Sequence, residues 1–319
     1  MYVGMRKSSW RLAYLLVVCV TTACAEGGRK GSPVEATVTS SGNATASINA
    51  GEAEAEAFVD TQVEESLGLA WSLVEGEATV NGEGEGEAQT QTSALLEIDD
   101  DQQGTRLLVD TSTLAGFLTG EIGQVVGEVV VVDESLGDRE KNLAENEHQA
   151  DLSVESEGML AAQIVHSSTS KRVPNVVLDG EDIGAVIEAI ASLNGAVAVS
   201  DGRSNVVSNA NTRVRNSRAS TASEMQVVVS SRGRASAEAY SETLAEALDR
   251  FGAARRTTTG SGSASFSADG DVNGFIDVSS KNRANRNSDR AVVRARSVVS
   301  GKNAAASSSA SSSSATRTK

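Results

Sequence analysis

The sequence predicts a mainly β-sheet protein with one or two helices, and an α+β arrangement is the alternative. Small or apolar residues alternate with polar ones at a period of two over residues 36–94, the spacing of a strand whose two faces differ. Only two prolines occur in 319 residues, so little interrupts long strands. The strand-like runs are rich in Ala, Gly and Ser, which indicates strands that pack with small side chains.

Residues 1–25 are predicted to be a cleaved signal peptide. A basic start precedes the apolar stretch 12–20, and the small-residue pattern Ala23-Cys24-Ala25 predicts cleavage after Ala25. We therefore expect a secreted, extracellular protein. The apolar stretch is shorter than the roughly 20 residues that a bilayer requires, so no membrane span is expected. The alternative is a bacterial lipoprotein that carries its lipid on Cys24.

Both cysteines of the chain, Cys19 and Cys24, lie in this leader. A mature chain without thiols must be stabilised by packing, extended pairing or assembly with other chains, because disulfides are not available to it. Asn43 begins the one N-glycosylation sequon, Asn43-Ala44-Thr45, and is glycosylated only if the chain meets a glycosyltransferase.

Residues 26–94 form an acidic, Ala/Gly/Glu-rich region that is predicted to make strands. The alternation shifts by one residue at Gly51, which indicates a bulge or a turn. Larger residues continue the alternation further along the chain. The predicted apolar faces are Ala44, Ala46, Ile48 and Ala50 before the shift, Ala53, Ala55, Ala57 and Val59 after it, and then Leu67, Leu69, Trp71 and Leu73.

The run 82–94 places Gly, Ala and Thr on one face and mostly Glu and Gln on the other. A face of Gly and Ala lets two sheets approach closely, as in stacked, silk-like sheets. The alternative is a disordered Gly/Glu linker, because glycine weakens strands and like charges repel.

Residues 95–178 form a Val/Leu-rich acidic region in which 125–126 and 129–132 resemble a buried strand pair. The dibasic pair Lys171-Arg172 precedes Pro174 in an expected polar loop. It predicts a processing site at Arg172, with ordinary surface charge as the alternative.

Residues 179–300 form a basic region with two expected helices and further strands. An apolar stripe at helical spacing predicts one helix over 181–194 and a second over 236–251, each followed by a glycine. The Ser/Ala-rich end, 301–319, is expected to be disordered.

Charge is divided between the two halves of the chain. Residues 26–160 hold 29 acidic and 5 basic residues, whereas 161–319 hold 14 acidic and 20 basic. Such halves attract one another or their neighbours, and salt weakens the attraction. The alternative is two solvated surfaces of opposite bias. The basic half lacks interleaved aromatics, so no nucleic-acid partner is expected.

Catalytic signatures are scarce in this sequence. His148 and His166 have no partner at zinc-ligand spacing, and a solvent-facing position is expected for each. Seven aromatic residues remain after the leader, too few to favour a compact enzyme with a deep pocket. A non-catalytic protein is therefore expected.

One segment is similar to a calcium loop of the EF-hand type. Oxygen donors stand at positions 1, 3, 5 and 9, with a glycine at position 6. Ser280 occupies position 12, where such loops have glutamate, so hairpin turns are the alternative. The candidate ligands are Asp269, Asp271, Asn273 and Asp277.

In composition and alternation the chain resembles silk-type or extracellular-matrix structural proteins, although it has no regular repeat. This resemblance implies a secreted structural or assembly protein that associates with itself or with other secreted structural proteins. The alternatives are a secreted acidic calcium-binding matrix protein or adhesin, and a secreted hydrolase.

Overall fold

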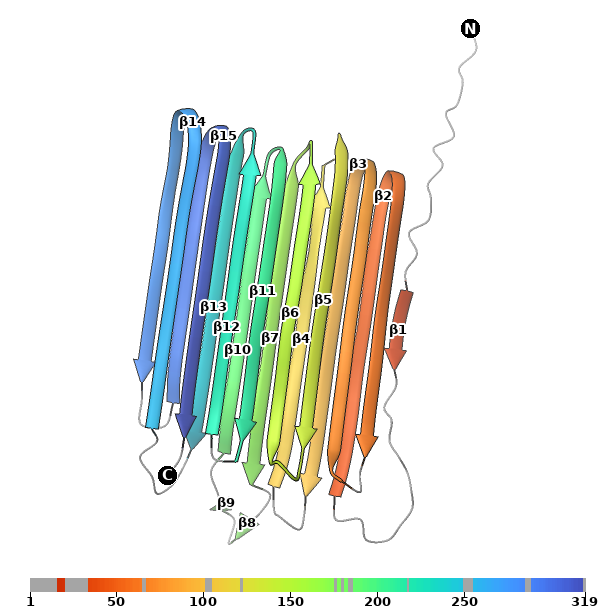
Figure 1. The fold of residues 1–319 in the computed structure, drawn as a ribbon, viewed down its shortest axis with the longest axis vertical. Coiled ribbons are helices and arrows are strands. Elements are labelled where there is room, and N and C mark those ends of the chain that lie inside the picture. Colours follow the sequence, from red (N-terminus) through yellow and green to blue (C-terminus); the bar gives the residue numbers. More distant parts are fainter. Residues whose placement is uncertain are drawn as a thin grey trace.

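The structure is a computed structural model, and it describes residues 16–20, 34–64, 67–100, 105–120, 123–174, 177–178, 181–182, 186–216, 218–248, 255–284 and 288–317. Nearly all of these residues lie in β-strands, so the mainly β prediction is confirmed. The long strands run side by side across the molecule (Figure 1).

Alternating small and polar residues with few prolines produce fifteen strands. In chain order they are β1 (Leu16–Val20), β2 (Val34–Glu64), β3 (Leu69–Asp100), β4 (Thr105–Thr119), β5 (Gln124–Asp138), β6 (Leu143–Ser156), β7 (Leu160–Pro174), β8 (Val177–Leu178), β9 (Glu181–Asp182), β10 (Val186–Val199), β11 (Gly202–Arg215), β12 (Arg218–Ser231), β13 (Arg234–Leu248), β14 (Arg255–Ala284) and β15 (Ser288–Arg317).

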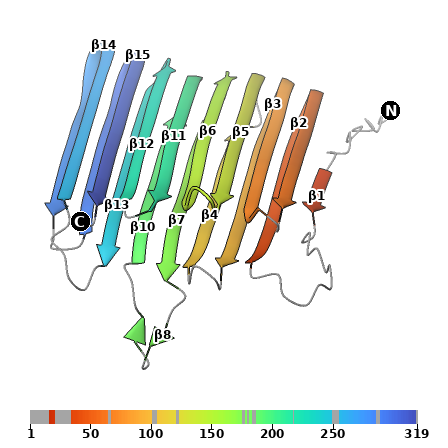
Figure 2. The same ribbon diagram turned by 60° about the horizontal axis from the view of Figure 1, so that its bottom comes forward.

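Apart from β8 and β9, which pair only with each other, and the short β1, the strands form two stacked layers joined by four long strands that pass from one layer into the other (Figure 2). Neighbours within each layer are antiparallel. Layer A consists, in order, of 34–48 of β2, 86–100 of β3, β4, β7, β10, β13, 288–300 of β15 and 273–284 of β14. Layer B consists, in order, of 50–64 of β2, 69–83 of β3, β5, β6, β11, β12, 304–317 of β15 and 255–267 of β14.

The bulge or turn predicted at Gly51 is the point where β2 passes between the layers. The β2–β3 register shifts between Ile48 and Ala50. Gly51 has φ of 150°, and a Cβ there would lie 2.2 Å from the Asn81 carbonyl oxygen. Only glycine allows the two backbones to approach this closely.

Small side chains fill the space between the layers, as the sequence predicts for Gly, Ala and Thr of 82–94. Ala88, Thr90, Thr92 and Ala94 are buried, and the glutamates of this run are exposed. The interior also contains many buried Ser and Thr residues. Because a buried hydroxyl requires a partner, many of them bond to each other, for example Ser223 to Ser241 at 2.7 Å.

The two expected helices are wrong where the structure describes them. Residues 186–194 belong to β10, and 236–248 belong to β13. Small or apolar residues in both segments also alternate with polar ones at a period of two, as in a strand. Hydrogen bonding to neighbouring strands on both sides favours the strand over the helix; β10, for example, lies between β7 and β13. Tyr240 and Leu244, which belong to the apolar stripe of the helix expected over 236–251, point outward between buried Ala239, Ser241 and Ala245.

Three further expectations need correction. The face of Leu67, Leu69, Trp71 and Leu73 points outward, because the adjacent Ala70, Ser72 and Val74 are the buried ones. The two valine runs form one strand, β5, rather than a pair. The disordered tail is wrong for 301–317, which form the end of β15 between β12 and β14.

Candidate functional site

The described residues contain one cluster of side chains that could hold a metal ion, Asp133, His148 and His166. Asp133 lies on β5 and His148 on β6 in layer B, and His166 lies on β7 in layer A. The alternating pattern of each strand directs these side chains into the space between the layers. All three are buried, with at most 1% of the residue exposed, so the expected solvent-facing position of both histidines is wrong.

The two imidazole rings stack, and their Nδ1 atoms meet the aspartate. The ring centroids are 3.7 Å apart with planes 10° from parallel. His148 Nδ1 lies 2.8 Å from Asp133 Oδ1, and His166 Nδ1 lies 3.8 Å from the same oxygen. One carboxylate oxygen is therefore shared by histidines from both layers.

Three hydroxyl groups complete the cluster. Thr92 and Thr113 donate hydrogen bonds to Asp133 Oδ2, the latter at 2.8 Å. Thr113 Oγ1 also lies 2.9 Å from His166 Nδ1, and Ser208 Oγ lies 2.9 Å from His148 Nε2. Because the single Thr113 proton goes to the carboxylate, His166 Nδ1 must be the donor toward Thr113 when no ion is bound.

The environment fixes the charges of these groups. Burial raises the pKa of Asp133, but interaction with His148, by charge and by hydrogen bond, and the hydrogen bond from Thr92 outweigh it and lower the pKa to about 2. Burial lowers the pKa of His166 well below 6.5, and the neighbouring His148 lowers it further against the opposing effect of Asp133. At neutral pH the cluster thus contains an ionised carboxylate beside a neutral His166.

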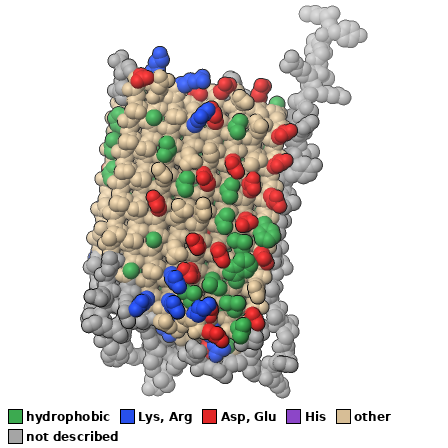
Figure 3. All heavy atoms as spheres, viewed as in Figure 1, with side chains coloured by type: hydrophobic (Ala, Val, Ile, Leu, Met, Phe, Trp, Pro, Cys, Tyr) green, Lys and Arg blue, Asp and Glu red, His purple; other side chains and the backbone are tan. Residues whose placement is uncertain are grey.

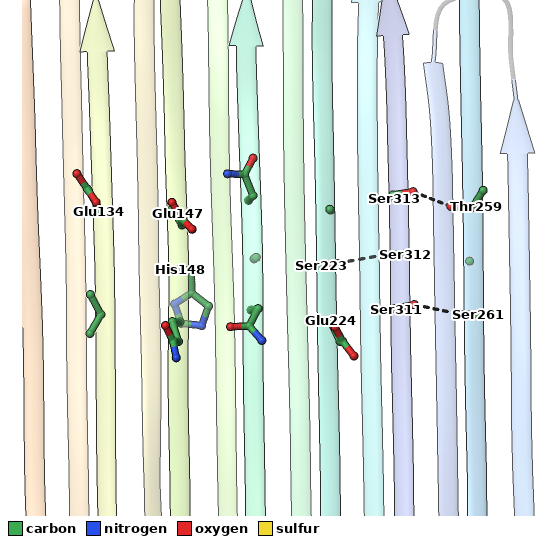
Figure 4. Close-up of a pocket in the computed structure, with 17 residues that line it drawn as sticks. Glu134, Glu147, His148, Ser223, Glu224, Thr259, Ser261, Ser311, Ser312 and Ser313 are labelled. Atoms are coloured by element: carbon green, nitrogen blue, oxygen red, sulfur yellow. Dashed lines mark hydrogen bonds between the residues drawn. The ribbon is translucent and has the colours of Figure 1, made fainter.

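A surface groove crosses the outer face of layer B at the level of His148 (Figure 4). Acidic side chains lie toward β5 and β6, and hydroxyl side chains lie toward β14 and β15. Ser311 bonds to Ser261 and Ser313 to Thr259 across these two strands. The groove residues form one face of the sheet, so it is an open trough rather than an enclosed pocket. The lining glutamates are Glu134, Glu147 and Glu224.

Each end of the stack is a long strand. Over most of its length this strand pairs with a neighbouring strand on one side only. Among the described residues, β14 pairs with β15 alone, and β2 pairs with β3 and, over Ser40–Ala44, with the short β1. Strand edges of this kind present unpaired N–H and C=O groups to other chains.

The charge asymmetry of the sequence follows the direction of stacking. The sequence of β2 contains six acidic residues and no basic one, and that of β14 contains four basic and three acidic residues. Acidic side chains gather on the part of the surface nearest β2 and β3 (Figure 3).

The predicted calcium ligands all lie on β14, where its register with β15 shifts between Ser267 and Asn273. Asp269 is exposed and accepts a hydrogen bond from Asn303 at 2.9 Å. Asp277 lies further along the strand, opposite Arg296, and the side chain of Asp271 is outside the described residues. Calcium binding at this segment stays a prediction.

The other predicted sites lie apart from the histidine cluster. Asn43 is in β2 next to β1, and Ala25 is outside the described residues. Arg172 lies in β7, paired with β4 and β10, rather than in the expected polar loop. A protease needs an extended, unpaired substrate, so the paired strand does not favour cleavage at Arg172 in the folded chain.

The phase of the alternation could have located the histidines. His148 has the parity of Leu152 and Val154 in β6, and His166 has the parity of Ala162 and Ile164 in β7, all of which are buried. The spacing of zinc motifs could not reveal the cluster, because its members come from three strands and two layers.

Among the described residues we find no helix that is both long enough and apolar enough to cross a membrane. Comparison of the chain with protein-family models, with curated proteins and with solved structures finds no match.

Proposed function

We propose that this chain is a secreted, non-catalytic structural protein whose copies stack end to end through the edges of β2 and β14. The observation that carries the proposal is that, among the described residues, the two-layer stack ends at both sides in a long strand that pairs on one side only over most of its length. Edge strands pair readily with other chains. Pairing of unlike edges repeats without closing on itself, which produces a filament.

The alternation of strand directions supports this geometry. Each layer contains eight antiparallel segments, so β2 and β14 run in opposite directions. A second copy displaced along the stack therefore places its β2 antiparallel to β14 of the first, in both layers at once.

The registers indicate which residues would meet. One row across layer A begins at Ser41 on β2 and ends at Lys281 on β14. If the row continues into a second copy, Lys281 of one copy lies beside Ser41 of the next. The row is Ser41, Ser93, Ser112, Ser167, Ser192, Glu242, Val292 and Lys281.

The charges of the two ends favour unlike pairing. Two β2 edges, with six acidic residues each and no basic one, would repel one another, whereas β2 and the net-basic β14 attract. The attraction acts over a Debye length of about 8 Å at physiological salt, so assembly should weaken as salt rises.

The leader would regulate this edge. β1 lies within residues 1–25 and pairs with Ser40–Ala44 on the open side of β2. Cleavage after Ala25 would remove β1 and make Ser40–Ala44 of β2 available for pairing with another chain. The chain would thus become able to assemble once it is exported.

A cross-linking experiment tests the proposed contact. Residues 26–319 contain no cysteine, so S41C and K281C introduce the only thiols. Under mild oxidation, or with a short bismaleimide, the double variant should form a ladder of oligomers beyond the dimer, because each copy can link on both sides.

The controls distinguish the ways in which edges could pair. Each single variant should stay mostly monomeric, and so should S41C/S192C, because Ser192 lies in the same row on the interior strand β10. If a single variant formed disulfide-linked dimers efficiently, two identical edges would be pairing with each other, instead of β2 with β14. A double variant that forms no ladder at low salt and high concentration would refute end-to-end stacking.

A further inference from the structure

We propose that Asp133, His148 and His166 form a binding site for one divalent transition-metal ion, of which zinc is the best fit. The ion would lie between the layers and link β5 and β6 of layer B to β7 of layer A. The site is independent of end-to-end assembly, because its three strands lie inside the stack.

The spacing of the donor atoms supports tetrahedral coordination. Zinc bonds of about 2.0–2.2 Å to nitrogen and oxygen place tetrahedral ligands about 3.4 Å apart. The distances from Asp133 Oδ1 to His148 Nδ1 and His166 Nδ1 are 2.8 and 3.8 Å. Thr113 Oγ1 lies 3.3 and 2.9 Å from the same two nitrogens. The four atoms are therefore spaced closely enough for one ion. Because the two rings stack nearly parallel and each Nδ1 lone pair lies in its ring plane, both rings would have to tilt toward the ion when it binds.

The chemistry of the donors fits the same ion. Two imidazoles and one carboxylate are a ligand set typical of zinc sites with an open fourth position. Thr113 or a water molecule would fill that position.

The surroundings hold the ligands in place. Thr92 bonds to the Asp133 oxygen that does not face the histidines, and Ser208 bonds to His148 Nε2. Such outer partners fix ring orientation at metal sites. His166 Nε2 has no partner among the described residues, so no hydrogen bond at that nitrogen prevents the ring from tilting out of its stack with His148.

A buried carboxylate also requires a compensating positive charge. Asp133 is completely buried, and an unpaired charge in such a place is costly. A bound metal ion would supply this charge, with neutral imidazoles as its ligands.

Zinc titration of the full-length chain, unfolded and refolded in metal-free buffer, tests the site. We expect one zinc per chain by elemental analysis after dialysis. H148Q and H166Q should each weaken the affinity by more than about 100-fold, the upper limit for loss of an outer partner. S168A is the matched control, since Ser168 is buried on β7 next to the cluster and its hydroxyl has no partner among the described residues.

X-ray absorption of the zinc-loaded wild-type chain keeps the test decisive if a histidine variant does not fold. Scattering from two imidazoles in a shell of nitrogen and oxygen atoms is the expected result. A wild-type chain that refolds but retains no zinc would overturn the proposal. So would zinc bound without imidazole scattering, or bound equally well by folded H166Q.

Discussion

At the scale of single residues, the interior combines very small side chains with a few polar groups that must be satisfied. Asp133 illustrates the consequence, because it accepts hydrogen bonds from Thr92, Thr113 and His148 in a place that solvent does not reach. Asp133 stabilises the fold through these hydrogen bonds. If its carboxylate were removed, its partners would stay buried in the core without an acceptor.

Replacing Asp133 by alanine should lower the free energy of unfolding by about 3–5 kcal/mol, the usual effect of breaking a buried charge pair. Denaturant unfolding followed by circular dichroism in metal-free buffer measures it. D151A is the control, because Asp151 is exposed on β6 and should change stability by less than about 0.5 kcal/mol. Equal effects of the two substitutions would contradict the role assigned to Asp133.

The phenol of Tyr240 should ionise at a higher pH than that of an ordinary tyrosine. Burial, followed by the hydrogen bond to Glu242 and its charge, raises the pKa of Tyr240 from 10.0 to about 12. It is the only tyrosine in residues 26–319, so tyrosinate absorbance of that chain should appear near pH 12 when folded and near pH 10 in denaturant.

The sign of the stability change follows from this raised pKa. The contribution of Tyr240 is fully present below pH 10 and is lost as the pH rises toward 12. E242Q removes the acceptor's charge and should shift the titration toward pH 10. A folded chain that already titrates at pH 10 would show that the Tyr240–Glu242 contact is absent.

At the scale of elements, β2 and β3 are long because their passage between the layers is built from glycine instead of from loops. At Gly51 and Gly82 a Cβ would lie 2.2 Å from the carbonyl oxygen of Asn81 or Ala50. The β2–β3 pair therefore continues through the passage, so that one end of the pair lies in layer A and the other end in layer B.

Gly51→Ala should destabilise the fold by about 1–3 kcal/mol, because it combines an unfavourable φ with a backbone clash. Gly120→Ala is the control: the nearest atom to a Cβ there is 3.4 Å away, and its φ is not positive. Thermal unfolding of both variants compares them. A tolerated Gly51→Ala would mean that β2 and β3 separate at this point.

At the scale of the whole molecule, acidic strands lie at one end of the stack and basic strands at the other. β2 and β3 together contain fourteen acidic residues and no basic one. The halves of the sequence thus correspond to the two ends of the stack, although strands such as β4 and β7 bring the halves together in the middle.

Hydrogen exchange should follow this arrangement. In the dispersed chain lacking residues 1–25, amides of β2 and β14 should exchange faster than those of β6 and β11, which pair on both sides. On assembly, protection should increase at β2 and β14 and stay unchanged at β6 and β11. Mass spectrometry of peptides resolves these strands, and equal gains everywhere would contradict assembly through the edges.

The sequence alone determined the local β-structure. Alternation at a period of two, the phase shift at Gly51 and the small face of 82–94 all correspond to the described strands, because side-chain direction in a strand depends only on parity. Alternation did not distinguish the buried face of a strand from the exposed face where both faces carry apolar residues, as at Leu69 and Trp71. In β10 and β13 the apolar residues also fit a helical period, which led to the wrong prediction of helices.

Only the tertiary structure decided which strands became neighbours. Pairing on both sides made β10 and β13 strands and ordered the Ser/Ala-rich 301–317, whose short side chains have little local preference of their own. It also brought Asp133, His148 and His166 together from different strands and layers. Contacts between residues distant in the sequence depend on register and layer order, which no local spacing encodes.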